Sequence, residues 1–179
     1  SSEDRLVEYL SRHAEGNPFF VVELLRALTE ERVLQPSDEG WRFGEIERLV
    51  MPSLIRQVID VRVDRLGEAT RQLLALAAVI GQDVSLELWA RLAGVDAGEL
   101  LPTIEQSVDA RLLEADRDGT RVRFVHALTR ESLYDGVIAP RRRQWHLNVA
   151  EALVDDPTSP DVVAYHLQQA DDSRAWEWL

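Results

Sequence analysis

The chain has 179 residues and a net charge of −12, from 32 acidic and 20 basic side chains, every basic one an arginine. Hydrophobic residues make up 45% of it, which excludes wholesale disorder and suffices for one ordinary domain or two small packed units. Cysteine is absent, which excludes disulfides, thiolate nucleophiles and cysteine-ligated zinc. No apolar run approaches the roughly 20 residues that span a bilayer, and the N-terminus does not resemble a signal peptide, so we expect a soluble, cytoplasmic protein.

The first 50 residues predict two helices followed by a small β-hairpin. Residues 6–13 form a short amphipathic pattern that stops at a Gly-Asn-Pro turn. Pro18 suits the first position of the next helix, because its missing N–H costs nothing there. Further along, residues 33–34 and 41–43 flank a polar turn over residues 35–40, as in a hairpin.

The next segment, which begins at residue 51, predicts a series of helices. After a helix over residues 54–66, the alanine- and leucine-rich residues 69–80 are apolar on most sides, which predicts a central, buried helix. Ser85 and Asp96 are suitable N-caps for two further helices. The second of these is expected to carry one apolar stripe, made of Leu100, Leu101, Ile104 and Val108.

After these helices the spacing of the apolar residues changes from that of a helix to that of a strand. Residues 111–115 and 120–125 alternate as strands do, and an Asp-Gly turn lies between them. Three helices followed by a two-stranded wing is the order of a winged-helix domain, so we expect one here, ending in a helix over residues 128–138.

The C-terminal part predicts two helices, over residues 141–154 and 161–170, separated from their neighbours by Pro140 and by a loop at residues 155–160. The two are expected to form an antiparallel pair, the unit of helical solenoids. A solenoid needs several such pairs to bury its faces, and the chain stops after two tryptophans. We therefore interpret its end as a truncation and expect further repeats in a longer parent protein.

The order of these motifs resembles that of the signal-transduction ATPases with numerous domains (STAND ATPases), above all the large bacterial LuxR-type transcriptional regulators. The segments that carry the resemblance span nearly the whole chain: residues 15–25, the hairpin at Trp41, and residues 52–54, 62–66, 73–81, 124–134 and 141–146. The resemblance implies a mainly α fold in three parts. These are a helical lid segment with a small β-hairpin (1–50), a winged-helix domain with a short β-wing (51–138), and the first helical hairpin of a TPR-like repeat region (139–179).

In that family the glycine-x-proline turn of the lid packs against the adenine and ribose of a bound nucleotide, which implies this role for Gly16 and Pro18. Relatives also carry a Met-His-Asp motif in the winged helix, whose histidine touches the β-phosphate of ADP, and His126 stands at the similar position. Ala127 replaces the aspartate of the motif, which implies that the switch would be held more weakly or by different contacts. A purely structural role for His126 at the start of a helix stays open beside the nucleotide-sensing one.

The sequence lacks most of a nucleotide site. A phosphate-binding loop requires a lysine, which the chain does not have, and no acidic pair follows a buried strand to bind magnesium. We therefore expect no catalytic residue, metal or cofactor in this chain, and a regulatory role that couples nucleotide state to conformational change. The resemblance implies ATP or ADP in the parent protein. It also implies two partners within the same chain, an upstream nucleotide-binding core and downstream helical repeats, with a protein partner or inducer on the solenoid.

Three further groups of residues have competing explanations. His146 and His166 lie on the last two helices and are expected to face one another in packing, since zinc requires more ligands than two. Residues 141–143 form the one basic cluster, for which a solvated helix start, salt bridges and an acidic partner are all open. His13 is expected to be a helix-end residue.

Two other functions compete with the regulatory one. A helical scaffold or adaptor that binds a protein partner is the first alternative, and a DNA-binding winged helix is the second. Against DNA, the helix over residues 97–110 carries Glu99, Glu105 and Asp109 and no basic residue, so it would repel phosphates. The wing offers three arginines beside acidic neighbours. We expect no membrane contact.

Overall fold

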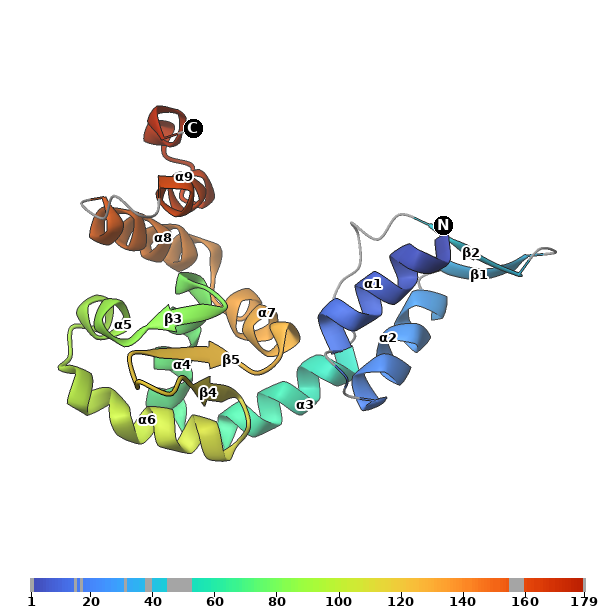
Figure 1. Cartoon of the computed structure of the whole chain (residues 1–179), viewed down its shortest axis with the longest axis horizontal. Coiled ribbons are helices and arrows are strands. Elements are labelled where there is room, and N and C mark those ends of the chain that lie inside the picture. Colours follow the sequence, from blue (N-terminus) through green and yellow to red (C-terminus); the bar gives the residue numbers. More distant parts are fainter. Residues whose placement is uncertain are drawn as a thin grey trace.

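The computed structural model describes residues 2–14, 16, 18–30, 32–37, 40–44, 53–154 and 160–178. Within them the chain is mainly helical, with two small antiparallel sheets (Figure 1). The elements in chain order are α1 (Ser2–Ala14), α2 (Pro18–Glu30), β1 (Leu34–Ser37), β2 (Gly40–Phe43), α3 (Ser53–Asp64), α4 (Glu68–Ile80), β3 (Asp83–Ser85), α5 (Leu86–Ala93), α6 (Ala97–Asp109), β4 (Leu113–Ala115), β5 (Arg121–Phe124), α7 (Ala127–Asp135), α8 (Ala139–Leu153), α9 (Pro160–Gln169) and the 3-10 helix η1 (Ser173–Glu177).

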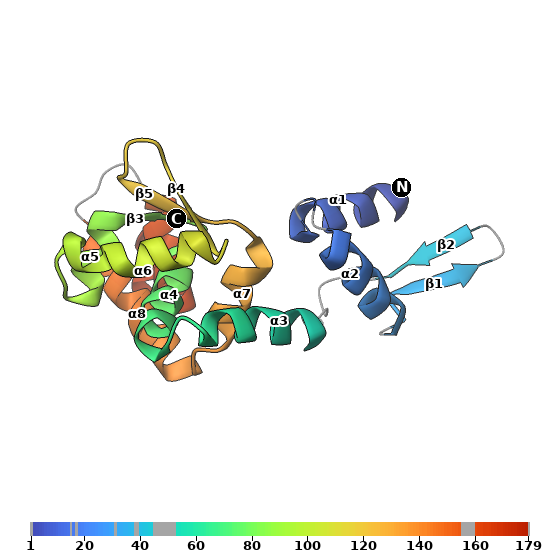
Figure 2. The ribbon, with the colours of Figure 1, turned by 90° about the horizontal axis from the view of Figure 1, so that it is seen from below.

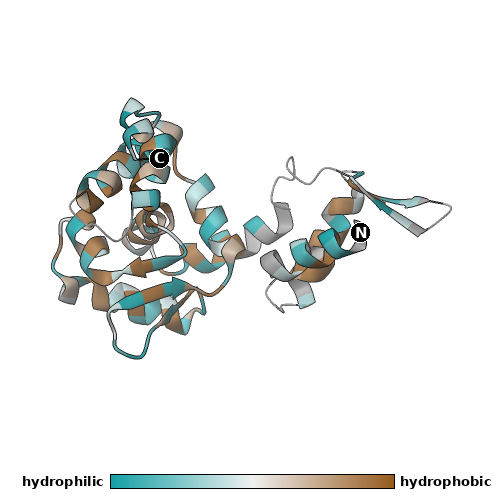
Figure 3. Cartoon of the chain, turned by 45° about the horizontal axis from the view of Figure 1, so that its top comes forward, coloured by the Kyte–Doolittle hydropathy of each residue, from teal (hydrophilic) through white to brown (hydrophobic). Residues whose placement is uncertain are grey.

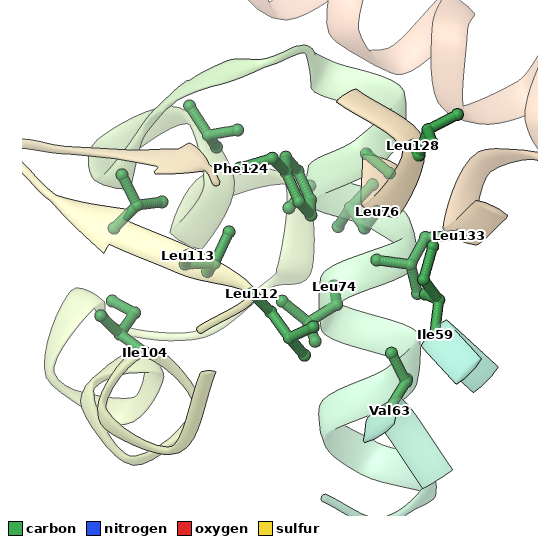
Figure 4. Packing of buried hydrophobic residues seen from close by; sticks show 14 of the residues in the cluster. Ile59, Val63, Leu74, Leu76, Ile104, Leu112, Leu113, Phe124, Leu128 and Leu133 are labelled. Carbon is green, nitrogen blue, oxygen red and sulfur yellow. The ribbon is translucent and has the colours of Figure 1, made fainter. Parts of the chain in front are cut away.

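Helix α4 is the centre of the fold, as its composition predicts. All six residues from Leu74 to Val79 are buried, so this half of the helix is covered on every side. The neighbours that cover it are α3, α5, α7, α8 and β3. Side chains from these elements and from the sheet meet α4 in one apolar core, where Leu74 and Leu76 face Phe124 and Leu112 (Figure 4).

The two strands predicted from the alternating residues are confirmed as an antiparallel pair, β4 and β5. Along β5 the exposed Arg121 and Arg123 alternate with the buried Val122 and Phe124. The strands of this part of the chain accordingly carry both hydrophilic and hydrophobic colours (Figure 3). A third strand, β3, pairs with the other edge of β5 and gives the order β3-β5-β4. Strand β3 has three residues, and one of its side chains is buried. Such a short strand does not show the alternation of apolar and polar residues, so the sequence pattern did not predict it.

Helix α6 begins with the predicted cap, and Asp96 and Glu99 form a reciprocal capping box. The predicted apolar stripe is wrong in half of its members. Leu100 and Ile104 are buried, whereas Leu101 is 52% exposed and Val108 is 38% exposed. The small polar residues Thr103 and Ser107 complete the buried face, because positions spaced by three and four lie on one side of a helix. Pattern reasoning that counts only large apolar residues misses such a face.

The N-terminal helices α1 and α2 pack beside one another and are linked to the rest of the molecule by α3 (Figure 2). They have a small apolar cluster of their own around Leu28 and Leu34, and they also contribute to the main core. Ala14, Phe20 and Leu24 belong to the same buried cluster as Ile59 of α3 and the residues around α4. The predicted hairpin is confirmed as β1 and β2, although residues 35–37, expected in the turn, extend strand β1.

The C-terminal helices are confirmed as a pair, α8 and α9, that packs side by side. Two boundaries differ from the prediction. Helix α7 stops at Asp135, before Gly136, and does not reach Ile138. Pro140 lies in the first turn of α8, where proline needs no N–H partner, so it opens that helix and does not precede it. Most of the predicted loop, residues 155–159, lies outside the described residues.

Two adjacent leucines of α6 provide a test of this packing. Leu100→Ala lowers the free energy of unfolding by about 2–5 kcal/mol, because it leaves a cavity in the core. Leu101→Ala, one position away and half exposed, changes it by less than about 0.5 kcal/mol. Urea titration of both variants measures the difference. Equal costs at the two positions would contradict the assigned buried face.

Candidate functional site

Two of the predicted site residues lie at the turn between α1 and α2. Gly16 is exposed and has a φ of +79°, a left-handed conformation that glycine adopts without strain. Pro18 is the first residue of α2, as predicted, and is also exposed. Their neighbours Glu15 and Asn17 lie outside the described residues. The turn therefore presents two small or rigid residues at the surface.

The third predicted residue, His126, joins strand β5 to helix α7. Its backbone is extended, with φ −130° and ψ 133°, and its carbonyl accepts the Thr129 N–H at 3.0 Å in the first turn of the helix. Phe124, two residues earlier, is fully buried, and the Val125 N–H donates to the Leu112 carbonyl at 3.0 Å. The position of the half-buried imidazole is thus set by both the sheet and the core.

The structure brings His126 against the helix that the Gly16–Pro18 turn opens. The ring of Phe20, on the first turn of α2, meets the imidazole edge to face, with ring centroids 5.4 Å apart and planes at 76°. Phe20 is 2% exposed, so this contact is part of the shared core. Phe20 is not among the residues that the sequence predicts for a site. The sequence feature that could have indicated Phe20 is its place in the Gly-Asn-Pro-Phe-Phe motif, two residues after the proline.

Helix α1 also packs against α7 near this contact. Tyr9 of α1 packs on the shared core, and Glu131 lies one turn beyond His126 on α7. Burial raises the pKa of the Tyr9 phenol, and the negative charge of Glu131 raises it further. Helices α1, α2 and α7 thus meet at one junction, which we call the α2–α7 junction after Phe20 and His126.

The two later histidines face one another, as predicted. Their Nδ1 atoms lie 2.7 Å apart, and both rings are buried, His146 on α8 and His166 on α9. Tyr134, which the sequence did not single out, joins them through a 3.0 Å contact between its hydroxyl and the His146 Nε2. No group of three or more histidine, aspartate or glutamate side chains in the described residues is arranged to hold a metal ion. The side chain of His13 lies outside the described part.

The basic cluster at the start of α8 is mostly paired within the chain. Arg142 donates to the Tyr134 carbonyl at 3.2 Å and lies 3.6 Å from Asp135. Arg143 pairs with Asp171 of the segment after α9 at 3.1 Å. The predicted salt bridges are therefore confirmed for two of the three arginines. Arg141 lies over the ring of Trp145, at 5.8 Å from its centroid.

Arg141 and Trp145 also line a pocket of about 250 Å³ between the N-terminal half of α4 and the start of α8. Its floor is apolar, made of Ala75, Leu133 and Val137, which are buried. Arg71, whose guanidinium pairs with Asp60 and Asp64, closes one side.

The surface of α6 is acidic where a DNA-binding helix would be basic. Glu99, Glu105 and Asp109 are all exposed. Of the wing arginines, Arg123 lies 3.9 Å from the carboxylate of Asp83 on β3. An acidic helix is repelled by phosphates, so this face does not support DNA binding.

Comparison with known proteins adds one match. A family model described as a domain of unknown function (DUF8739) matches residues 1–40, which include α1, α2 and β1. No curated protein and no solved structure matches the chain. In the described residues, no helix combines the length and the hydropathy needed to cross a bilayer.

The contact at the α2–α7 junction can be measured with a double-mutant cycle. Phe20→Leu and His126→Ala are expected to show a coupling of about 0.5–1.5 kcal/mol in the free energy of unfolding, because edge-to-face rings attract beyond their buried area. His126→Ala combined with Arg117→Ala, on the exposed wing turn, serves as the control cycle. Coupling no larger than in the control would show that the two rings do not interact.

Proposed function

We propose that the chain is a non-catalytic regulatory segment of a nucleotide-switched STAND-type ATPase, of the kind found in large bacterial LuxR-type regulators. Residues 1–50 would be the end of its helical lid, 51–138 its winged helix and 139–179 the first hairpin of a TPR-like region. The observation that carries the proposal is the contact between Phe20 and His126. It joins the two motifs for which the resemblance implies nucleotide contacts, although more than 100 residues of sequence separate them.

The order of the elements supports the winged-helix part of the proposal. Helices α4, α5 and α6 are followed by the β4–β5 hairpin, and the short strand β3 between α4 and α5 completes a three-stranded sheet. The pairing of α8 with α9 supports the proposed repeat hairpin.

In the proposed mechanism the junction completes a site whose phosphate-binding part lies in the upstream core. The rigid edge of Pro18 and the accessible backbone at Gly16 suit the base and ribose of the nucleotide. An N–H of the His126 imidazole suits a phosphate oxygen of ADP. With ADP bound, lid and winged helix stay closed on the core, and nucleotide exchange or an inducer on the repeats shifts the population to an open arrangement.

A protein partner on the C-terminal hairpin is a second candidate, and the exposed apolar side chains there favour it. Val162 and Tyr165 of α9 are each about 40% exposed, and Trp176 of η1 is 79% exposed. Such a surface fits either a scaffold function or the contact with further repeats. An open reading frame that extends upstream into a phosphate-binding loop would favour the regulatory ATPase over a free-standing adaptor.

The proposal predicts the kinetics of nucleotide release in the parent protein. His126→Ala is expected to speed ADP dissociation about tenfold or more, because it removes a hydrogen bond to a charged group. Arg117→Ala, exposed on the wing turn, is the control and should leave the rate unchanged. Stopped-flow release of a fluorescent ADP analogue measures both. An unchanged rate in the His126 variant would remove the sensing role.

A further inference from the structure

A chain of hydrogen bonds crosses the interior between four helices. The Tyr134 hydroxyl of α7 lies 3.0 Å from the His146 Nε2 of α8, and the His146 Nδ1 lies 2.7 Å from the His166 Nδ1 of α9. His166 in turn makes a hydrogen bond to the backbone of Ile80, the last residue of α4. Both imidazoles are buried, with 0% and 1% of their surface exposed.

The positions of the protons in this chain follow from its two ends. The Ile80 backbone group is an acceptor, because its hydrogen bond favours the protonated form of His166, so the His166 Nε2 must carry a hydrogen. In a neutral ring the Nδ1 of His166 is then an acceptor, and the Nδ1 of His146 must donate to it. The His146 Nε2 is left as an acceptor, and the Tyr134 hydroxyl donates to it. Each donor has an acceptor when both rings are neutral.

The chain tolerates one extra proton but not two. One proton can enter at the His146 Nε2, where the Tyr134 hydroxyl rotates and accepts it, and the hydrogen between the two Nδ1 atoms can then belong to either ring. A second proton places an N–H on both Nδ1 atoms, which face each other at 2.7 Å, and no rotation of either buried ring relieves that contact. Protonation of both histidines therefore breaks the chain at its middle.

Two arginines near the chain oppose its protonation. Arg130 of α7 lies 5.8 Å from the centre of the Tyr134 ring, and Arg142 of α8 lies 4.8 Å from it. Arg142 is partly balanced by Asp135 at 3.6 Å. From α9 the neutral ring of Tyr165 contacts both imidazoles edge on, and from α4 the Ile80 carbonyl is the polar group that faces His166.

The pKa values agree with this geometry. Burial, followed by the charges of Arg130 and Arg142, lowers the pKa of His146 to about 4. Burial and the neighbouring His146 lower the pKa of His166 to about 4 as well. A released histidine titrates near 6.5 and so binds a proton at a higher pH than the docked one. The stabilising effect of the chain is complete above pH 6.5 and declines as the pH falls toward 4.

We propose that the chain Tyr134–His146–His166–Ile80 is a proton-ordered latch that fixes α9 against α8 and the end of α4, and that protonation of both histidines releases it. The core around α4 stays folded when the latch opens, because it is buried without any contribution from α9. The latch stands independently of the nucleotide role proposed above.

The first test reads the protons directly in the whole chain by NMR of the imidazole nitrogens at pH 7. The latch requires a hydrogen on Nδ1 of His146 and on Nε2 of His166. On acidification from pH 7 to 4, the amides of residues 160–169 should lose hydrogen-exchange protection at a higher pH than those of residues 74–79. A charged His166 at pH 7, or simultaneous loss of protection in both segments, would overturn the proposal.

Matched tyrosine variants separate the latch from simple packing. Tyr134→Phe removes the first donor of the chain and should lower the protection factors of α9 about tenfold at pH 7, with those of α4 unchanged. Tyr165→Phe alters a ring that touches the same imidazoles but donates nothing to the chain, and should change them by less than about twofold. His166→Phe should make the protection of α9 independent of pH between 6.5 and 4.5. Equal effects of the two tyrosine variants would contradict the latch.

Discussion

The burial of residues 74–79 in the second half of α4 is the constraint on which the other elements depend. A stretch of helix that is apolar on every side must be covered on every side, and α3, α5, α7, α8 and the sheet pack around α4. Three neighbours are also fixed to its backbone carbonyls: Trp89 of α5 donates to Leu73, Arg130 of α7 to Ala78, and His166 of α9 bonds to Ile80. These bonds set where each neighbour lies along α4, which burial alone does not determine.

Helix α7 connects the two regions for which we propose a function. His126 precedes it and meets Phe20, whereas Tyr134 near its other end begins the hydrogen-bond chain to α9. Between them Arg130 fixes the helix to α4. Helix α7 is thus held at both ends and at its middle.

Much of the helical order could be predicted from the sequence, because caps and breakers are local. Ser85 caps α5, as predicted, and Gly94 ends the helix in a left-handed conformation. Strand β3, the buried face of α6 and the role of Tyr134 could not be predicted, since each is decided by contacts between distant segments. Gly16, Pro18 and His126 came from a family resemblance. Their nucleotide contacts remain a prediction, and the structure adds Phe20 as the residue that connects them.

The central claim is that this chain completes a nucleotide site built elsewhere. Isothermal titration with ADP and ATP tests it most directly, on this chain and on a longer protein that restores the upstream core. The account predicts that the longer protein binds ADP or ATP and that residues 1–179 by themselves do not. Replacing Phe20 or His126 in the longer protein should weaken the binding. Tight binding of ADP or ATP by residues 1–179 alone would contradict the account, because the chain would then contain a complete nucleotide site of its own.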